Sequence, residues 1–149
     1  SSDLTTLEGQ TVPLTALKGQ WLLISVSSGQ CDAQCQSHLL MQRQVRAALG
    51  REKDRTDWVW LITDDAPVSD ALRQGLGDAQ VFRTNPQTVS QWLQPAPGAA
   101  LEDHLYLVDP QGRWMMRFPP RLSMDQASSL KREWERLLRA SASWDRPGR

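Results

Sequence analysis

The chain has no long apolar run and no excess of charge of either sign, and it contains only two cysteines. No segment approaches the roughly 18 consecutive apolar residues of a transmembrane helix. The chain has 17 basic and 17 acidic residues, so its formal net charge is zero. Balanced charge argues against binding of nucleic acid or of an anionic membrane as the main function. The 149 residues fit one domain, which we place at 1–140, with a polar tail over 141–149.

Hydrophobic patterning predicts an α/β fold. Two compact apolar runs, Trp21–Val26 and Trp58–Thr63, are typical of strands that are buried on both faces. A helix expected from about Cys31 to Leu49, ended by Gly50, separates them, and this spacing predicts that the two strands are parallel. Further elements are expected as a β-hairpin over 4–14, a helix over 69–74, a strand over 80–82, a helix over 86–93, a β-hairpin over 105–118 and a helix over 124–138. This order predicts a thioredoxin-like fold, with an N-terminal β-hairpin and a central mixed sheet flanked by helices.

Cys31 and Cys35 are the only cysteines, and three residues separate them. They follow the first buried strand, and ligands collect outside the carboxyl ends of parallel strands. A helix N-terminus at this point would present unpaired N–H groups, which stabilise a thiolate. If both residues are helical, their Cα atoms lie about 6 Å apart, which suits a disulfide or two thiolates on one soft metal ion. Burial as two small apolar residues is the third interpretation.

Three segments make the chain resemble the Sco/SenC family, thioredoxin-fold proteins that bind copper and help to assemble the copper centre of cytochrome c oxidase. They are the opening LEGQTVPLTALKGQW, the strand that leads into the C-x-x-x-C pair, and EDHLYLVDPQGRW near the end. The resemblance implies that Cys31 and Cys35 are two thiolate ligands of copper and that His104 is the third ligand. Two thiolates and one imidazole suit Cu(I) and can also hold Cu(II).

The ligand histidine of the Sco/SenC family can be aligned with this sequence in two ways. If Tyr106–Leu107 is matched to the Tyr-Leu pair of the family, the ligand histidine falls near Leu101. If the count runs back from Gly112, His104 takes the place where thioredoxins keep a cis-proline against the cysteine pair. The other histidine, His38, lies three residues after Cys35, and we interpret it as a solvated helix residue.

The cysteine pair leaves three functions open. Copper handling would use Cys31, Cys35 and His104. A thiol-disulfide oxidoreductase of the thioredoxin superfamily would need only the pair, with Cys31 as the attacking thiolate and Cys35 as the resolving thiol. A non-catalytic thioredoxin-like binding module would keep the two cysteines as a residual disulfide. Whether the protein is an enzyme depends on which of these functions it has.

The resemblance also implies partners and a location. The partner would be a cytochrome c oxidase subunit, another copper chaperone or a thiol-redox protein, and the chain is expected to be a monomer that binds no nucleic acid. The chain opens at Ser1 without a methionine or a signal peptide, so we expect a leader or anchor upstream. We therefore expect the protein in the periplasm or another extracytoplasmic space, tethered to the inner membrane by that upstream segment.

Overall fold

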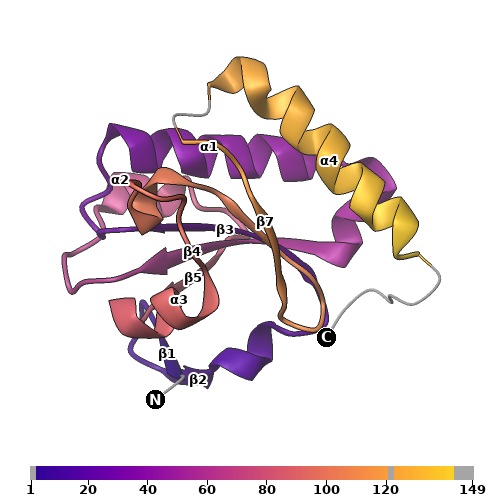
Figure 1. Cartoon of the computed structure of the whole chain (residues 1–149). Coiled ribbons are helices and arrows are strands. Elements are labelled where there is room, and N and C mark those ends of the chain that lie inside the picture. Colours follow the sequence, from indigo (N-terminus) through magenta and orange to yellow (C-terminus); the bar gives the residue numbers. More distant parts are fainter. Residues whose placement is uncertain (1–2, 121–122, 143–149) are drawn as a thin grey trace.

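A seven-stranded mixed β-sheet runs through the molecule (Figure 1). The computed structural model describes residues 3–120 and 123–142. In the order β2-β1-β5-β4-β3-β6-β7, the strands are β1 Asp3–Thr6, β2 Thr11–Pro13, β3 Trp21–Ser27, β4 Thr56–Ile62, β5 Gln80–Arg83, β6 Tyr106–Val108 and β7 Trp114–Arg117. Strands β3, β4 and β5 are parallel, and the other neighbouring pairs are antiparallel. The predicted mixed sheet and N-terminal hairpin are confirmed.

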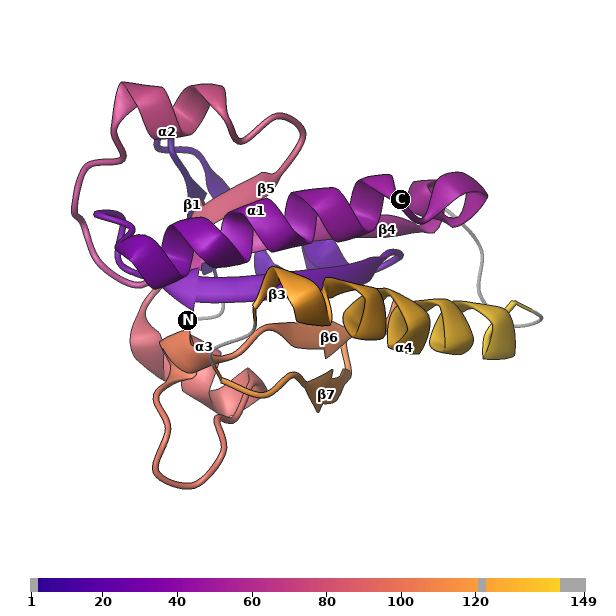
Figure 2. The same ribbon diagram turned by 90° about the horizontal axis from the view of Figure 1, so that it is seen from above.

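Helices cover both faces of this sheet. They are α1 Ala33–Ala47, α2 Asp70–Gln74, α3 Pro86–Trp92 and α4 Ala127–Ala140, with short 3-10 turns η1 Leu14–Leu17, η2 Gly50–Arg55, η3 Leu101–Asp103 and η4 Met124–Gln126. Seen from above, α1 and α4 lie side by side over one face (Figure 2). In Figure 1, α3 lies below strands β3 and β4, on the opposite side from α1 and α4.

The β3–α1–β4 unit has the predicted parallel pairing, in which Trp21 of β3 faces Thr56 of β4 and Ser27 faces Ile62. Helix α1 begins at Ala33, two residues later than expected. Its N-cap is Asp32, because the side chain of this residue accepts a hydrogen bond from the helical backbone. The carboxyl end of β3 is therefore joined to α1 by a short non-helical turn that contains Cys31.

Side chains of β3 alternate between two cores. The even-numbered residues face the core that includes residues of α3 and the N-terminal hairpin: Leu22, Ile24 and Val26. The odd-numbered residues lie on the face covered by α1 and α4: Trp21, Leu23, Ser25 and Ser27. Four tryptophans are buried in the cores of the molecule: Trp21, Trp58, Trp60 and Trp134. Only the face under α1 and α4 thus receives serines from this strand.

Arg55 anchors the C-terminal end of α4. Its guanidinium donates to the carbonyl of Leu138 and to Oγ of Ser141, both at 3.0 Å. Ser141, where the polar tail was expected to begin, is buried by this contact. Residues 143–149 of that tail lie outside the described residues. Within the described ranges, no helix is long and apolar enough to cross a membrane.

Candidate functional site

The two cysteines form a disulfide, with their Cα atoms 5.0 Å apart. Only Cys35 is helical, as the third residue of α1, whereas Cys31 precedes the cap residue Asp32. The φ angle of Cys31 is +52°, in the left-handed region that residues with a Cβ seldom adopt. The premise that both residues are helical was therefore wrong. A left-handed turn at Cys31 sets their separation.

Backbone hydrogen bonds hold this turn on both sides of the disulfide. The amide of Cys31 donates to the carbonyl of Ser28 at 3.1 Å, and its own carbonyl accepts from Nε2 of Gln36 at 3.1 Å. The amide of Cys35 donates to Oδ1 of Asp32 at 2.9 Å. Hydrogen bonds as well as the sulfur–sulfur bond therefore hold both cysteines in position.

A buried hydroxyl reaches the sulfur of Cys35 from the sheet. Oγ of Ser27, the last residue of β3, lies 3.0 Å from Sγ of Cys35. Nε1 of Trp60 donates to the same Oγ at 2.7 Å, and the carbonyl of Ser28 lies 3.1 Å from it. The sequence alone assigned neither Ser27 nor Trp60 a role beside the cysteines. The available signal was a serine at an alternate position of an otherwise apolar strand, directly before the cysteine turn.

Asp64 ties the cysteine turn to the loop after β4. Its Oδ1 accepts from the amide of Gly29 at 3.0 Å and from the amide of Ala66 at 3.1 Å. Hydrogen bonds from the Ser28 side chain and the Gly29 amide hold the pKa of Asp64 below its ordinary value. Gly29 lies so close to the loop that a Cβ there would be 2.3 Å from the carbonyl oxygen of Ala66. Glycine is thus required for the two loops to meet.

Both cysteines line a cavity of about 260 Å³ at the carboxyl ends of β3 and β4. Its other walls come from the cysteine turn, the start of α1 and two further loops: Ser27, Ser28, Gln30, Asp32, Gln34, Thr63 and Glu102. The side chains of Cys31 and Cys35 are nearly covered, so a partner reaches them through this cavity. The arrangement places the disulfide in a cavity whose other lining residues are all polar or charged.

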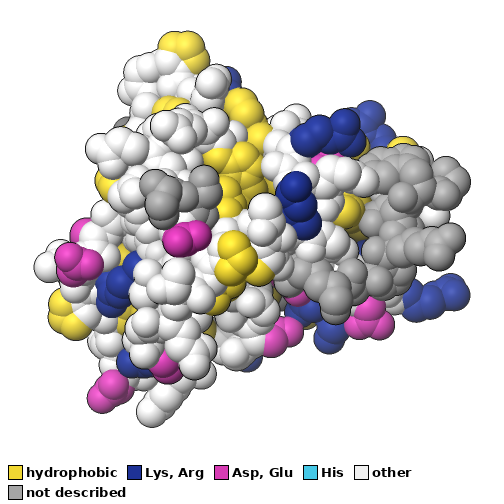
Figure 3. Space-filling model, turned by 90° about the horizontal axis from the view of Figure 1, so that it is seen from below, with side chains coloured by type: hydrophobic (Ala, Val, Ile, Leu, Met, Phe, Trp, Pro, Cys, Tyr) yellow, Lys and Arg dark blue, Asp and Glu magenta, His cyan; other side chains and the backbone are white. Residues whose placement is uncertain are grey.

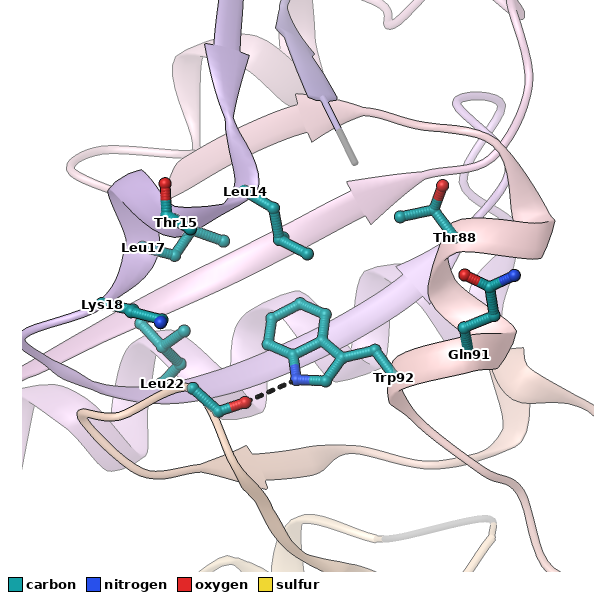
Figure 4. A pocket seen from close by; sticks show the side chains of 9 residues that line it. Leu14, Thr15, Leu17, Lys18, Leu22, Thr88, Gln91 and Trp92 are labelled. Carbon is teal, nitrogen blue, oxygen red and sulfur yellow. Dashed lines mark hydrogen bonds between the residues drawn. The ribbon is translucent and has the colours of Figure 1, made fainter. Parts of the chain in front are cut away.

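A second cavity, of about 270 Å³, lies between η1, β3 and α3 and has a different character. Figure 3 looks onto the underside of the molecule, where hydrophobic side chains gather in a hollowed area. Figure 4 shows Leu14 and Trp92 among the cavity walls, with Trp92 Nε1 donating to the Gly112 carbonyl at 2.8 Å. Lys18 is the one charged residue among its lining residues. This cavity contains no cysteine and lies apart from the disulfide.

His104 is buried, and both nitrogens of its ring have backbone partners. Nε2 accepts from the amide of Ala96 at 3.1 Å, and Nδ1 lies 2.7 Å from the carbonyl of Phe118. Because a backbone N–H can only donate, Nε2 must be the unprotonated nitrogen and Nδ1 the donor. This neutral imidazole has no lone pair left for a metal ion. Among the described residues, no three His, Cys, Asp or Glu side chains form a possible metal site.

His38 is buried, so its interpretation as a solvated residue was wrong. The helical face that carries Cys35 turns onto the sheet within one turn, and His38 goes with it. Its Nε2 has no hydrogen-bond partner among the described residues. Burial lowers the pKa of His38; the charges of Asp32 and Asp103 oppose this shift, and His104 adds to it. Burial therefore favours the uncharged form of His38.

The comparisons with known proteins agree on the fold. Residues 21–141 match the family described as transmembrane-like, thioredoxin-like, C-terminal domain. No curated protein matches the chain with significant sequence similarity.

Solved structures of similar shape include copper-bound Sco proteins and a thiol:disulfide interchange protein. Copper-bound ScoI of Bradyrhizobium japonicum is 19% identical, with a TM-score of 0.60, over 89% of this chain and 96% of that one. Copper-bound ScoI of Arabidopsis thaliana is 14% identical, with a TM-score of 0.66, over 90% and 96%. A thiol:disulfide interchange protein from Chlorobium tepidum is 14% identical, with a TM-score of 0.63, over 88% and 90%. At these identities the likeness establishes the thioredoxin-like fold.

Proposed function

The chain belongs to the family of transmembrane-like, thioredoxin-like C-terminal domains, and from that premise we propose that it is a thiol-disulfide exchange protein. The observation that carries this proposal is the Cys31–Cys35 disulfide, which lines a cavity at the carboxyl ends of the parallel strands. A dithiol–disulfide couple is complete with two sulfurs and requires no third side chain. The geometry of His104 supports the same choice, because both of its ring nitrogens are already engaged.

Exchange proceeds through a mixed disulfide. A partner thiolate attacks Sγ of Cys31, a bond forms between these two sulfurs, and the electron pair of the broken Cys31–Cys35 bond moves onto Sγ of Cys35. A second partner thiolate then attacks the partner sulfur of the mixed disulfide and releases Cys31 as a thiolate. The partner loses two electrons and gains a disulfide; Cys31 and Cys35 gain those electrons and take up protons as solvent pH requires. Reduction of a partner is the same sequence in reverse.

The resemblance to Sco/SenC sequences supports a specific setting. We propose that the partner is a cysteine-bearing protein of cytochrome c oxidase copper-centre assembly: an oxidase subunit, a copper chaperone or another thiol-redox protein. Thiol exchange would then set the redox state of cysteines that receive the metal. We place this activity in the periplasm or an equivalent extracytoplasmic space, with the chain as a monomer tethered to the inner membrane by a segment upstream of Ser1.

Trapping of the mixed disulfide tests the exchange proposal. With Cys35→Ser, oxidised glutathione should form a stable adduct on Cys31, detected as a single mass increase, because the resolving thiol is missing. The matched variant Cys31→Ser leaves only Cys35, and the faster of the two variants identifies the sulfur that a partner thiol reaches first, since both cysteines line the same cavity. If the reduced wild-type protein exchanges with oxidised glutathione no faster than free dithiothreitol does, the exchange function is wrong.

Copper binding by the dithiol is the second candidate, and the likeness to two copper-bound ScoI structures favours it. After reduction, Cys31 and Cys35 offer two thiolates on one turn, a donor set that suits Cu(I). His104 as the third ligand stays a prediction. To bind the metal, its ring would have to give up the hydrogen bond to Ala96 or the one to Phe118.

Anaerobic titration of the reduced protein with Cu(I), against a competing chelator, separates these candidates. Binding tighter than that of a model dithiol would support the copper role, and its absence would rule that role out. The variant His104→Ala, checked for folding by circular dichroism, should bind Cu(I) as the wild type does if the dithiol acts alone. Weaker binding by this variant would restore His104 to the ligand set.

A further inference from the structure

The hydrogen bonds around Ser27 have a fixed direction. An indole N–H can only donate, so Nε1 of Trp60, 2.7 Å away, uses a lone pair of the Ser27 oxygen. The single hydroxyl proton of Ser27 must then point to another acceptor. Two are in reach: Sγ of Cys35 at 3.0 Å and the carbonyl of Ser28 at 3.1 Å. Trp60 is fully buried, and Ser27 is largely buried at the wall of the cavity beside the disulfide.

The relative strength with which these two acceptors bind the Ser27 hydroxyl proton changes when the disulfide opens. In the disulfide, Sγ of Cys35 is a neutral sulfur and a weak acceptor. When a thiolate attacks Cys31, the departing electron pair places negative charge on Sγ of Cys35. A hydrogen bond to an ionised acceptor is shorter and about twice as strong as one between neutral groups. The charge therefore develops at a position where a hydroxyl donor already lies within hydrogen-bond distance.

We propose that Ser27, oriented by Trp60, is a catalytic residue of the exchange reaction that stabilises the charge developing on Cys35. Ser27 touches the reacting sulfur, and Trp60 is a positioning residue that acts through Ser27. The inference rests on the proposed exchange function and adds the group that favours Cys35 as the leaving sulfur. Attack on Cys31 follows from it, because the opposite attack would place charge on the sulfur that has no such donor among the described contacts.

β3 offers a matched control for this proposal. Ser25 lies two residues before Ser27, on the same face of the same strand, and its side chain is buried. Its Oγ has no hydrogen-bond partner among the described residues. Ser25→Ala and Ser27→Ala thus remove the same atom from neighbouring positions, and only the second removes a donor to sulfur.

The test measures the second-order rate constant for reduction of the disulfide by dithiothreitol. Ser27→Ala should lower it about tenfold, which is the difference between a hydrogen bond to a charged and to a neutral acceptor. Ser27→Thr keeps the hydroxyl and should restore most of the rate, and Trp60→Phe, which leaves the hydroxyl free to turn, should lie in between. Ser25→Ala should react as the wild type does. Urea unfolding of each variant confirms that the folded state is the one measured.

A second measurement separates catalysis from a local change of structure. In a Cys35→Ser background, the rate at which iodoacetamide alkylates Cys31 should not respond to Ser27→Ala, because the sulfur that Ser27 contacts is absent. An equal loss of rate in both backgrounds, or a wild-type rate of disulfide reduction in Ser27→Ala, would overturn the inference. Neither result would contradict the proposed thiol-disulfide exchange function. That function fails separately if the wild-type disulfide reacts with dithiothreitol no faster than oxidised glutathione does.

Discussion

The two faces of β3 differ although one seven-residue strand supplies both. On the face toward α3, its side chains are apolar from one end to the other: Leu22, Ile24 and Val26. On the face under α1 and α4, the strand begins with large apolar side chains and ends with two serines: Trp21, Leu23, Ser25 and Ser27. The first face contributes only packing. The second changes from packing to polar contacts within a few residues, at the end where the disulfide lies.

Buried polar groups follow the same division. The helix-covered face also contains His38 and Gln42, and Nε2 of Gln42 donates to the carbonyls of Leu23 and Val59 at 2.9 and 3.0 Å. Buried polar groups cost free energy unless they are paired, so a purely structural face does not accumulate them. The difference indicates that the fold tolerates a less favourable core on the side that serves the cysteines.

The largest expected effect compares the two faces directly. Ile24→Ala should lower the free energy of unfolding by about 2–5 kcal/mol, because it opens a cavity in a fully apolar core. Ser25→Ala, one position along on the other face, removes a hydroxyl without a described partner and should change stability by less than about 0.5 kcal/mol. Urea unfolding with unchanged m-values measures both. Similar losses for the two variants would remove the distinction between the faces.

The second-largest expected effect is that of replacing His104, whose two ring nitrogens both have hydrogen-bond partners. His104→Ala leaves the Ala96 amide and the Phe118 carbonyl without their side-chain partner, so we expect a loss of about 2–3 kcal/mol. Thermal unfolding followed by circular dichroism measures this loss. A wild-type transition temperature would mean that His104 has no structural role and is held in place for another purpose, such as metal binding.

Gly29→Ala probes the loop that carries the cysteine turn. The added methyl group would press on the Ala66 carbonyl oxygen, a backbone atom that cannot rotate away, and should cost about 1–3 kcal/mol. Asp64→Asn is the comparison variant, since it keeps the side-chain shape while it weakens the bond to the same loop. Chemical denaturation gives the stabilities, and a neutral Gly29→Ala would show that the two loops move apart at no cost.

The smallest effect is a pH dependence that His38 contributes. Burial lowers the pKa of His38 in the folded protein, so between its ordinary value of 6.5 and the lower folded value the unfolded chain binds more protons. Stability should therefore be complete above about pH 6.5 and should fall as the solution becomes more acidic. His38→Leu should flatten that part of the stability–pH curve, measured by urea unfolding from pH 7.5 to 5. An unchanged curve would assign the acid sensitivity to other groups.

Much of the fold could be predicted because local patterns and packing agree. The apolar runs of β3 and β4 allow little but buried strands, and Pro86 marks the first turn of α3. The thioredoxin-like order follows from these elements. At the site, the disulfide partners were predictable from number and spacing alone, since Cys31 and Cys35 are the only cysteines.

The surroundings of the disulfide were less accessible from the sequence. The left-handed conformation falls on Cys31 itself, where a glycine or asparagine would have predicted it, and it depends on the contacts of the adjoining loop. His38 was predicted to be solvated because most histidines on helices are, but tertiary packing decides which face of α1 turns inward. The contact between Ser27 and Trp60 joins residues 33 positions apart, and only strand register brings them together.

The anchoring of α4 by Arg55 has a consequence for the order in which the protein is made. The ribosome adds Leu138 83 residues after Arg55, and α4 carries Leu130, Trp134 and Leu138 into the core. Until that helix emerges, the apolar side chains at the start of β3 lack the part of their cover that α4 supplies, although the cysteine turn has already been synthesised. We expect the nascent chain to expose this hydrophobic surface for a time, and such surfaces are prone to aggregation. Packing of α4 should therefore follow synthesis of the cysteine turn as a separate, later step.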